Sequence, residues 1–288
     1  MINDVELSDK QIKDIKELAS ETREKFGVFG DVPIGSDIKM LVEKKGILLC
    51  EYPFSDNSET HTYGNITWFR TEDETITFIG LNTASYYDEQ IFALAHEIYH
   101  YTTHTGKAYS KEEDEDKLTE KKADRFAAEL LITERALNKL VKENFGCSDL
   151  SGISNLKLLR FVARIQCEWW LPYQAIVNRL FEENYINSEK LGLLYNIDCR
   201  SDDGVYIRIL KSTDRDIAEL LNRKTRAKGV SNKILEATIS NYEEGFIDDD
   251  EFVKLLKLFD KTPEDFGIEI VGELDDELKE FFESEDGE

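Results

Sequence analysis

The sequence predicts an α+β fold that is mainly helical, with a small β-sheet and a small, mostly helical C-terminal module. Apolar residues recur at helical spacing along most of the 288 residues, and only a few short runs are rich in β-branched and aromatic residues. Apolar residues make up 41% of the chain and aromatic residues 11%, so a sizeable core can be buried. Because this length exceeds that of a typical single domain, we expect a main domain over residues 1–198 and a second unit over residues 199–288.

Capping signals and β-rich runs indicate the first elements. Ser8 followed three residues later by Gln11 is a capping box, which predicts an amphipathic helix behind it. A short helix and then a strand over residues 47–50 are expected next. Residues 66–70 and 75–81 are β-rich runs separated by a polar stretch, and they predict a β-hairpin that ends just before the next helix.

The helix after the hairpin is predicted from a second capping box. Ser85 and Asp88 form this signature, and the apolar residues behind it repeat at helical spacing toward His104. Residues 111–117 are all charged, so they are expected to form a solvated loop, with a helix resuming near Leu118.

The rest of the chain gives weaker signals. Apolar spacing predicts further helices over residues 153–182. Residues 205–210 indicate a short strand, and helical patterns return near residues 231–243 and 249–259. Residues 272–288 are acidic enough to predict partial disorder or a frayed helix.

Charge excludes some partners and favours others. With 36 Lys and Arg against 60 Asp and Glu, the net charge of -24 would repel DNA, RNA and anionic lipid. We therefore expect no direct contact with nucleic acid, whereas a basic protein would be attracted by the same field.

The N-terminus has no signal-peptide pattern, and no apolar run approaches the ~18 to 20 residues of a membrane helix, so we expect a cytoplasmic protein that does not contact membranes. The four cysteines show no CxxC spacing, which argues against a zinc ribbon or a disulfide framework.

The chemistry of the chain is indicated by an HExxH motif, in which His96 and His100 flank Glu97. Residues four apart project from one face of a helix, so both imidazoles can bind the same Zn²⁺ at about 2.0 to 2.1 Å. Glu97 lies one position round the helix, where its carboxylate can act as general base on a water molecule that zinc activates. Three of the four histidines fall within nine positions, which favours one zinc ion per chain over a helix with two surface histidines.

A catalytic zinc normally has three protein ligands, so a third is needed. His104 lies a further turn along the same helix, too far along the axis to reach a metal held by His96 and His100. Glu120 lies on the next predicted helix, which apolar residues anchor, and it is the better candidate. Asp124, one turn later, is placed to orient a ligand histidine through its second ring nitrogen.

These segments resemble the ImmA/IrrE family of metallopeptidases. Residues 96–104 read HEIYHYTTH and residues 120–131 read EKKADRFAAELL, which is similar to the family's HExxH with a later histidine and its ExxAxxFAxxLL helix. A looser resemblance extends over residues 8–195. The chain departs from the family in having Ile132-Thr133 where Met-Pro is common, and in having no helix-turn-helix before the peptidase part.

The resemblance implies a zincin-like, thermolysin-like peptidase core over residues 1–198. It also implies limited proteolysis of a regulatory protein, such as the helix-turn-helix repressor of a mobile element or a stress-response regulator. Together with the charge, this favours a basic DNA-binding regulator as the substrate, and any regulation of the peptidase must act through a partner.

The strand at residues 75–81 would be the edge strand along which an extended substrate pairs. Candidate donors to the oxyanion or to the substrate are His104, His61, Tyr63 and Tyr99.

Two other functions remain open. The chain could retain zinc and the fold but act by sequestering a partner, for example in a toxin-antitoxin pair, or it could hydrolyse small amides. An intact Glu97 favours an enzyme over a pure binding protein. The sequence leaves open the substrate, the activating signal, the role of the C-terminal module and the oligomeric state.

Overall fold

The computed structural model describes residues 6–54, 62–72, 74–105 and 113–270. Its strands are β1 (Leu48–Tyr52), β2 (Gly64–Arg70), β3 (Thr75–Asn82) and β4 (Gly229–Val230). Its first helices are α1 (Asp9–Lys25), α2 (Ile38–Lys44), α3 (Tyr87–Thr103), α4 (Glu113–Leu131), α5 (Glu134–Phe145) and α6 (Asn155–Trp169). The later ones are α7 (Tyr173–Glu182), α8 (Ser188–Tyr195), α9 (Val205–Thr213), α10 (Arg215–Leu221), α11 (Asn232–Glu243) and α12 (Asp249–Lys257).

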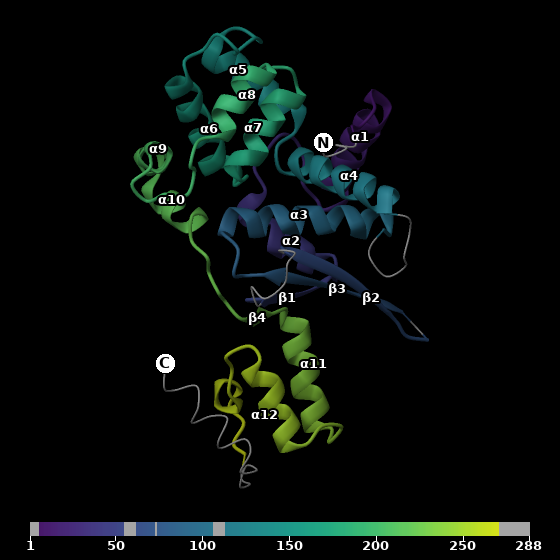
Figure 1. The fold of residues 1–288 in the computed structure, drawn as a ribbon. Coiled ribbons are helices and arrows are strands. Elements are labelled where there is room, and N and C mark those ends of the chain that lie inside the picture. The colour runs from purple at the N-terminus through teal and green to yellow at the C-terminus, as the bar shows by residue number, and fades with distance from the viewer. Residues whose placement is uncertain (1–5, 55–61, 73, 106–112, 271–288) are drawn as a thin grey trace.

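The molecule is built around α3, which lies along one face of a small mixed sheet (Figure 1). Helices α5 to α8 gather on the far side of α3 from the sheet, and α11 and α12 lie beyond the sheet at the opposite end (Figure 1). This arrangement confirms the predicted α+β, mainly helical fold.

The sheet has the order β2-β3-β1-β4. β2 and β3 pair antiparallel, with Gly64 opposite Leu81, which confirms the predicted hairpin. β1 runs parallel to β3, and β4 pairs antiparallel with β1. β3 is therefore an inner strand, and the expectation that it forms the substrate-binding edge is wrong. The open edge on this side belongs to β2, because strand order depends on long-range pairing that a local pattern does not encode.

α3 is buried on most of its surface because the sheet and α4 enclose it. Ile91, Leu94 and Ala95 are each at most 1% exposed. The helix begins one residue later than the capping box at Ser85 predicts, since Tyr86 is the N-cap and its N–H donates to the Glu89 carboxylate at 3.1 Å. A helix enclosed in this way holds its side chains in fixed directions.

Two other predicted elements are corrected. α4 begins at Glu113, earlier than Leu118, because glutamate and lysine are good helix formers even in a charged run; residues 111–112 lie outside the described part. The strand predicted at residues 205–210 is wrong, since α9 forms there. Its β-branched residues imitate a strand, but its buried side chains are spaced for a helix that packs on α6.

The segment after α8 returns to the start of α3. Arg200 Nη2 donates to Asp88 Oδ1 at 2.8 Å and to Glu89 Oε1 at 3.0 Å. Asp88 is fully buried, and its other oxygen accepts a hydrogen bond from Gln166 on α6 at 2.8 Å. Burial raises the pKa of the Asp88 carboxyl, and the Arg200 guanidinium opposes that shift. Because a buried carboxylate requires a partner, Arg200 fastens the first turn of α3.

The same segment continues along the sheet. Arg226 N–H donates to the Thr83 carbonyl at 2.9 Å, and Thr83 Oγ1 donates to the Ala227 carbonyl at 2.8 Å. β4 follows, and Leu49 N–H of β1 donates to Ser231 Oγ at 2.6 Å. Residues 199–231 thus contact both α3 and β1.

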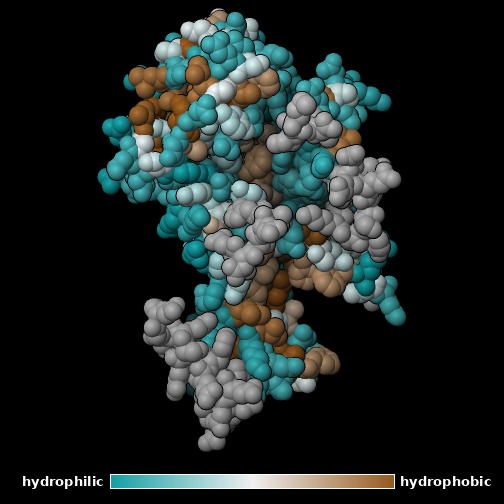
Figure 2. Space-filling view, viewed as in Figure 1, coloured by the Kyte–Doolittle hydropathy of each residue, from teal (hydrophilic) through white to brown (hydrophobic). Residues whose placement is uncertain are grey.

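α11 and α12 form a module with a small core of their own. Phe252, Val253 and Leu256 are its buried apolar residues on α12, and Tyr242 of α11 stacks on Phe252 with ring centroids 4.2 Å apart. α11 buries none of its residues, and apolar surface is visible on this module and where it joins the sheet (Figure 2). Asp248 accepts a hydrogen bond from Glu251 N–H at 2.9 Å and so acts as a helix cap.

The domain boundary after residue 198 stays a prediction. Tyr206 and Leu210, beyond that boundary, belong to the same core cluster as Leu94 and Ile98 of α3. The prediction for residues 272–288 lies outside the described part of the chain. None of the described helices is both long and apolar enough to cross a bilayer.

The Arg200 contacts lead to a prediction about stability. Replacing Arg200 by Gln leaves the buried Asp88 carboxylate without its cationic partner, which should cost roughly 3–5 kcal/mol of unfolding free energy. Urea unfolding followed by circular dichroism measures this loss. The control is Arg215→Gln, which removes an exposed i,i+4 pair with Glu219 and should change little. An Arg200→Gln protein that unfolds at the wild-type urea midpoint would show that Arg200 does not fasten α3.

Candidate metal centre

His96 and His100 lie one turn apart on α3 and direct their Nε2 atoms toward the same point. The two Nε2 atoms are 3.1 Å apart, with ring centroids separated by 5.0 Å. His100 is 4% exposed, and the side chain of His96 is 16% exposed. Because α3 is enclosed on most sides, both imidazoles extend from a rigid support.

α4 brings two carboxylates to these histidines. Glu120 Oε2 lies 3.2 Å from His96 Nε2, and Glu120 Oε1 lies 3.7 Å from His100 Nε2. Asp124, four residues later on the same helical face, places Oδ1 2.9 Å from His96 Nδ1. The structure therefore brings together the two histidines and both carboxylates for which the sequence predicted metal-site roles.

The second nitrogen of each ring has a partner that fixes the orientation of the imidazole. His96 Nδ1 meets Asp124, and His100 Nδ1 lies 3.1 Å from Thr105 Oγ1. Both Nε2 atoms are thereby directed to the centre of the group, as in metal sites whose outer contacts orient their histidines. Burial lowers the pKa of His96, but hydrogen bonds to Asp124 and Glu120 outweigh this and raise the pKa to about 10. The carboxylates around His96 therefore stabilise positive charge at this position.

The donor atoms fit a zinc ion. Ligands at about 2.0–2.1 Å in a tetrahedral site stand about 3.3–3.4 Å from one another, and the observed separations are 3.1, 3.2 and 3.7 Å. Two imidazoles and one carboxylate are a donor set of catalytic zinc sites, which keep a fourth position for water or substrate. In the described part of the chain, this is the one group of three such side chains whose donor atoms all lie within 4.8 Å of one another.

Glu97 lies beside the donors, on the side of α3 that faces β2. It is 6% exposed, and a Cβ atom added to Gly64 would come within 3.3 Å of both Glu97 Cγ and Glu97 Oε1. Gly64 is the first residue of β2. Its lack of a side chain lets the strand approach the Glu97 carboxylate closely.

The donors and Glu97 line a cleft of about 1080 Å³, which is larger than most small-molecule pockets. One wall comes from the start of β2 and the residue before it, and the other from α7 and α8. These walls are formed by Tyr63, Gly64, Asn65 and Ile66 on one side and by Gln174, Ala175, Asn178, Glu182 and Tyr195 on the other. The cleft can accommodate a length of polypeptide.

On its side away from β3, the β2 wall presents backbone groups that pair with no other described strand. Asn82 N–H donates to the Tyr63 carbonyl, so residues 63 and 82 form a hydrogen-bonded antiparallel pair. Such pairs recur at every second residue, which turns the N–H and C=O groups of Gly64 and Ile66 away from β3. Because β2 is an edge strand, these groups face the open side of the sheet and can pair with another chain.

The structure does not bring together all the candidate contacts for substrate or oxyanion. Tyr63 lines the cleft. His104 is an exposed residue in the left-handed conformation that ends α3, at φ 52°, and it is not among the residues that line the cleft. Tyr99 is 7% exposed and packs on Phe126 in the core. His61 lies outside the described residues.

Sequence reasoning missed several residues of the site. Thr105 orients His100 from beyond the end of α3, and the only available signal was a hydroxyl residue shortly after the motif. The β2 wall could not be predicted without knowledge of the strand order in the sheet. The α7 and α8 wall has no motif, because its cleft-facing residues Gln174, Asn178 and Glu182 follow ordinary helical spacing.

Comparison with known proteins agrees with this geometry. Residues 42–181 match the Peptidase_M78 family, described as the IrrE N-terminal-like domain. No curated protein sequence matches the chain. The matched span includes β1 to β3, α3 and α4, and therefore all the candidate metal donors and Glu97. The chain thus carries an IrrE N-terminal-like domain, which places residues 42–181 in the ImmA/IrrE family of metallopeptidases.

Proposed function

We propose that the chain is a zinc-dependent endopeptidase that cuts a regulatory protein at a specific site. The observation that carries this proposal is the convergence of His96, His100 and Glu120 beside Glu97, in a cleft bordered by an open strand edge. The family supports a metallopeptidase in general terms. We further propose that the metal is zinc, that Glu97 is the general base and that the substrate is a regulatory protein.

His96, His100 and Glu120 are the residues that would hold zinc, with Asp124 and Thr105 fixing the imidazole orientations. A bound zinc ion supplies Lewis acidity, which brings the pKa of a water molecule near neutrality and polarises a carbonyl group. Glu97 would act as general base, accepting a proton from the attacking water and delivering it to the amine nitrogen as the C–N bond breaks. Its position next to the donors and against Gly64 supports this role.

The open edge of β2 would bind the substrate as an added strand. The outward N–H and C=O groups of Gly64 and Ile66 can pair with an extended backbone, which would place one peptide bond beside Glu97. β2 would thus take the role that the sequence suggested for residues 75–81.

The substrate would be a basic, DNA-binding regulator, such as the repressor of a mobile element or a stress-response regulator. The net charge of -24 would accelerate association with a basic protein, and added salt would screen that attraction. The alternative is a zinc-containing protein that sequesters its partner. The intact Glu97 beside the donors favours cleavage, because sequestration needs no general base.

Metal binding is predicted to depend on Glu120 and not on His104. Purified protein should hold one zinc ion per chain by elemental analysis. Zinc titrations against a competing chelator should show a large loss of affinity for Glu120→Ala, a loss of about 10- to 100-fold for Asp124→Ala, and wild-type affinity for His104→Ala. Normal affinity in Glu120→Ala, with loss in His104→Ala, would overturn the ligand assignment.

The general base can be tested separately from the metal. Glu97→Gln should keep wild-type zinc content, since no donor changes, and should lose nearly all cleavage. The assay is co-expression with a small helix-turn-helix repressor encoded by a neighbouring gene, followed by mass spectrometry of the fragments. Cleavage at the wild-type rate by Glu97→Gln would exclude it as the base. A repressor left intact by the wild type under every inducing condition would count against the proposed substrate.

A substitution at Gly64 tests the role of β2. A methyl group there would press on the Glu97 carboxylate at 3.3 Å, so Gly64→Ala should lower kcat/KM by about 10- to 100-fold through misplacement of the base while zinc affinity is unchanged. The matched control is Gly152→Ala, because nothing lies within 4 Å of a Cβ atom at Gly152. Equal kcat/KM values for the two variants would indicate that the approach of β2 to Glu97 is unimportant.

A further inference from the structure

The metal centre depends on the placement of α4, because Glu120 and Asp124 belong to that helix and both histidines belong to α3. The core side of α4 includes the small residues Ala123 and Ala127, each fully buried. Apolar packing is not directional, so it fixes the position of a helix along its axis less sharply than hydrogen bonds do. A directional restraint lies immediately beyond Asp124.

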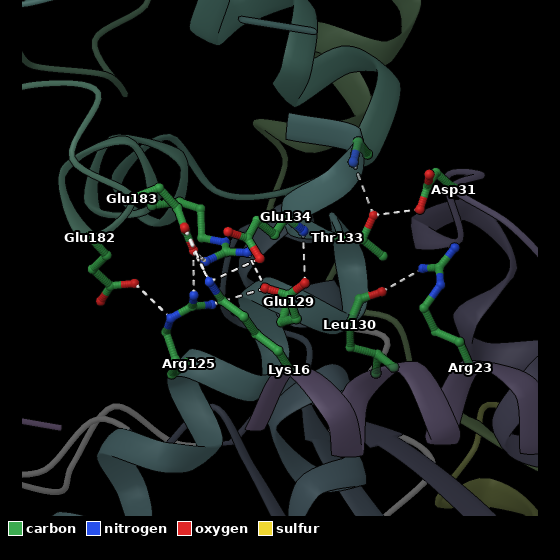
Figure 3. A network of polar contacts seen from close by, with 12 residues as sticks. Lys16, Arg23, Asp31, Arg125, Glu129, Leu130, Thr133, Glu134, Glu182 and Glu183 are labelled. Atoms are coloured by element: carbon green, nitrogen blue, oxygen red, sulfur yellow. Dashed lines mark hydrogen bonds and ion pairs between the residues drawn. The ribbon is translucent and has the colours of Figure 1, made fainter. Parts of the chain in front are cut away.

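This restraint is a ring of four charged side chains from two helices, with Arg125 and Glu129 on α4 and Arg179 and Glu183 beside them from α7 and its C-cap. Arg125 Nη2 donates to Glu183 Oε1 at 2.6 Å, and its Nη1 donates to Glu129 Oε2 at 3.3 Å. Arg179 hydrogen-bonds the same two carboxylates. Figure 3 shows Arg125, Glu129 and Glu183 directed toward one another. Each carboxylate bridges both guanidinium groups, which a planar, forked donor allows.

The ring is tied to two further helices. Lys16 of α1 lies 3.1 Å from carboxylate oxygens of both Glu183 and Glu134 (Figure 3). Glu134 N–H, at the start of α5, donates to Glu129 Oε1 at 2.7 Å. These contacts therefore fix the position of α4 relative to α1, α5 and α7.

Because the ring is buried, it opposes movement of α4 along its helix axis. Arg125 and Glu129 are each 4% exposed, and Arg179 is 1% exposed. A shift of α4 along its axis would lengthen charge-assisted hydrogen bonds and leave ions unpaired away from water, which is strongly unfavourable. Arg125 follows Asp124 directly and stands five residues after Glu120, so it lies only about 7.5 Å along the helix axis from the candidate ligand.

Arg125 also reaches the cleft. Its Nε lies 3.2 Å from Glu182 Oε2, and both side chains are among those that line the cleft. One guanidinium group thus contacts the helix that carries the carboxylates and the helix that forms the opposite wall.

We infer that Arg125 is a positioning residue for the metal centre, holding Glu120 and Asp124 at the distance from the α3 histidines that metal binding requires. The inference rests on the zinc site of the proposed function and is independent of the substrate. Arg125 itself touches none of the three donors in the contacts above; it acts through the placement of α4.

The test uses the full chain and two metals. Arg125→Lys keeps a positive charge but loses the fork that binds several carboxylates, so zinc affinity measured against a competing chelator should fall about 10-fold. The visible absorption spectrum of the cobalt-substituted protein should change as well, because it reports the geometry of the ligands. Wild-type affinity and spectrum in Arg125→Lys would overturn the inference.

One control separates positioning from general stability. Val141→Ala opens a small cavity at a fully buried site on α5, away from the four ring side chains. It should lower the unfolding midpoint and keep the wild-type cobalt spectrum. A spectrum that changes in Val141→Ala as it does in Arg125→Lys would reduce Arg125 to a structural role.

A second variant covers the case in which Arg125→Lys does not fold. Glu183→Gln keeps the shape of the acceptor but removes its charge from the ring, and it should shift the cobalt spectrum in the same direction. An unshifted spectrum there would contradict the inference. A wild-type chain that binds neither zinc nor cobalt would overturn both this inference and the proposed function, whereas a metal-binding chain without peptidase activity would overturn only the latter.

Discussion

The candidate metal centre requires three donor atoms from two separate helices to lie within a few ångströms of one another, and the contacts that position those helices follow from this constraint. His96 and His100 come from α3, and Glu120 comes from α4, with donor separations of 3.1 to 3.7 Å. Neither helix can satisfy the geometry alone, since a helical turn offers only two donors on one face. The fold therefore has to fix two helices against each other.

Each helix is fixed by a buried charge contact at one end. Asp88 and Arg200 hold the start of α3, while Arg125 and Glu129 hold the part of α4 just beyond Asp124. Buried ion pairs add little net stability compared with apolar packing, but they are directional and costly to break. Their value here lies in the orientation of the helices that carry the donors.

Local patterns in the sequence were enough to predict the fold class and the side chains that gather at the candidate metal centre. The HExxH spacing and the Glu120 to Asp124 interval follow helical periodicity, and the structure places these side chains together. The edge role of β2 could not be predicted, because it depends on the strand order. Arg200 and the α7 wall were missed for the same reason, since they reach the site through contacts between residues far apart in the chain. The helix at residues 205–213 was misjudged from its β-branched composition.

The most direct test of the metal centre is anomalous diffraction at the zinc absorption edge from crystals of the zinc-loaded chain. We expect one peak about 2 Å from Nε2 of His96, Nε2 of His100 and a carboxylate oxygen of Glu120, with Glu97 near the peak but outside bonding distance. A peak elsewhere, or one bound by Glu97 in place of Glu120, would contradict the assignment of these ligands.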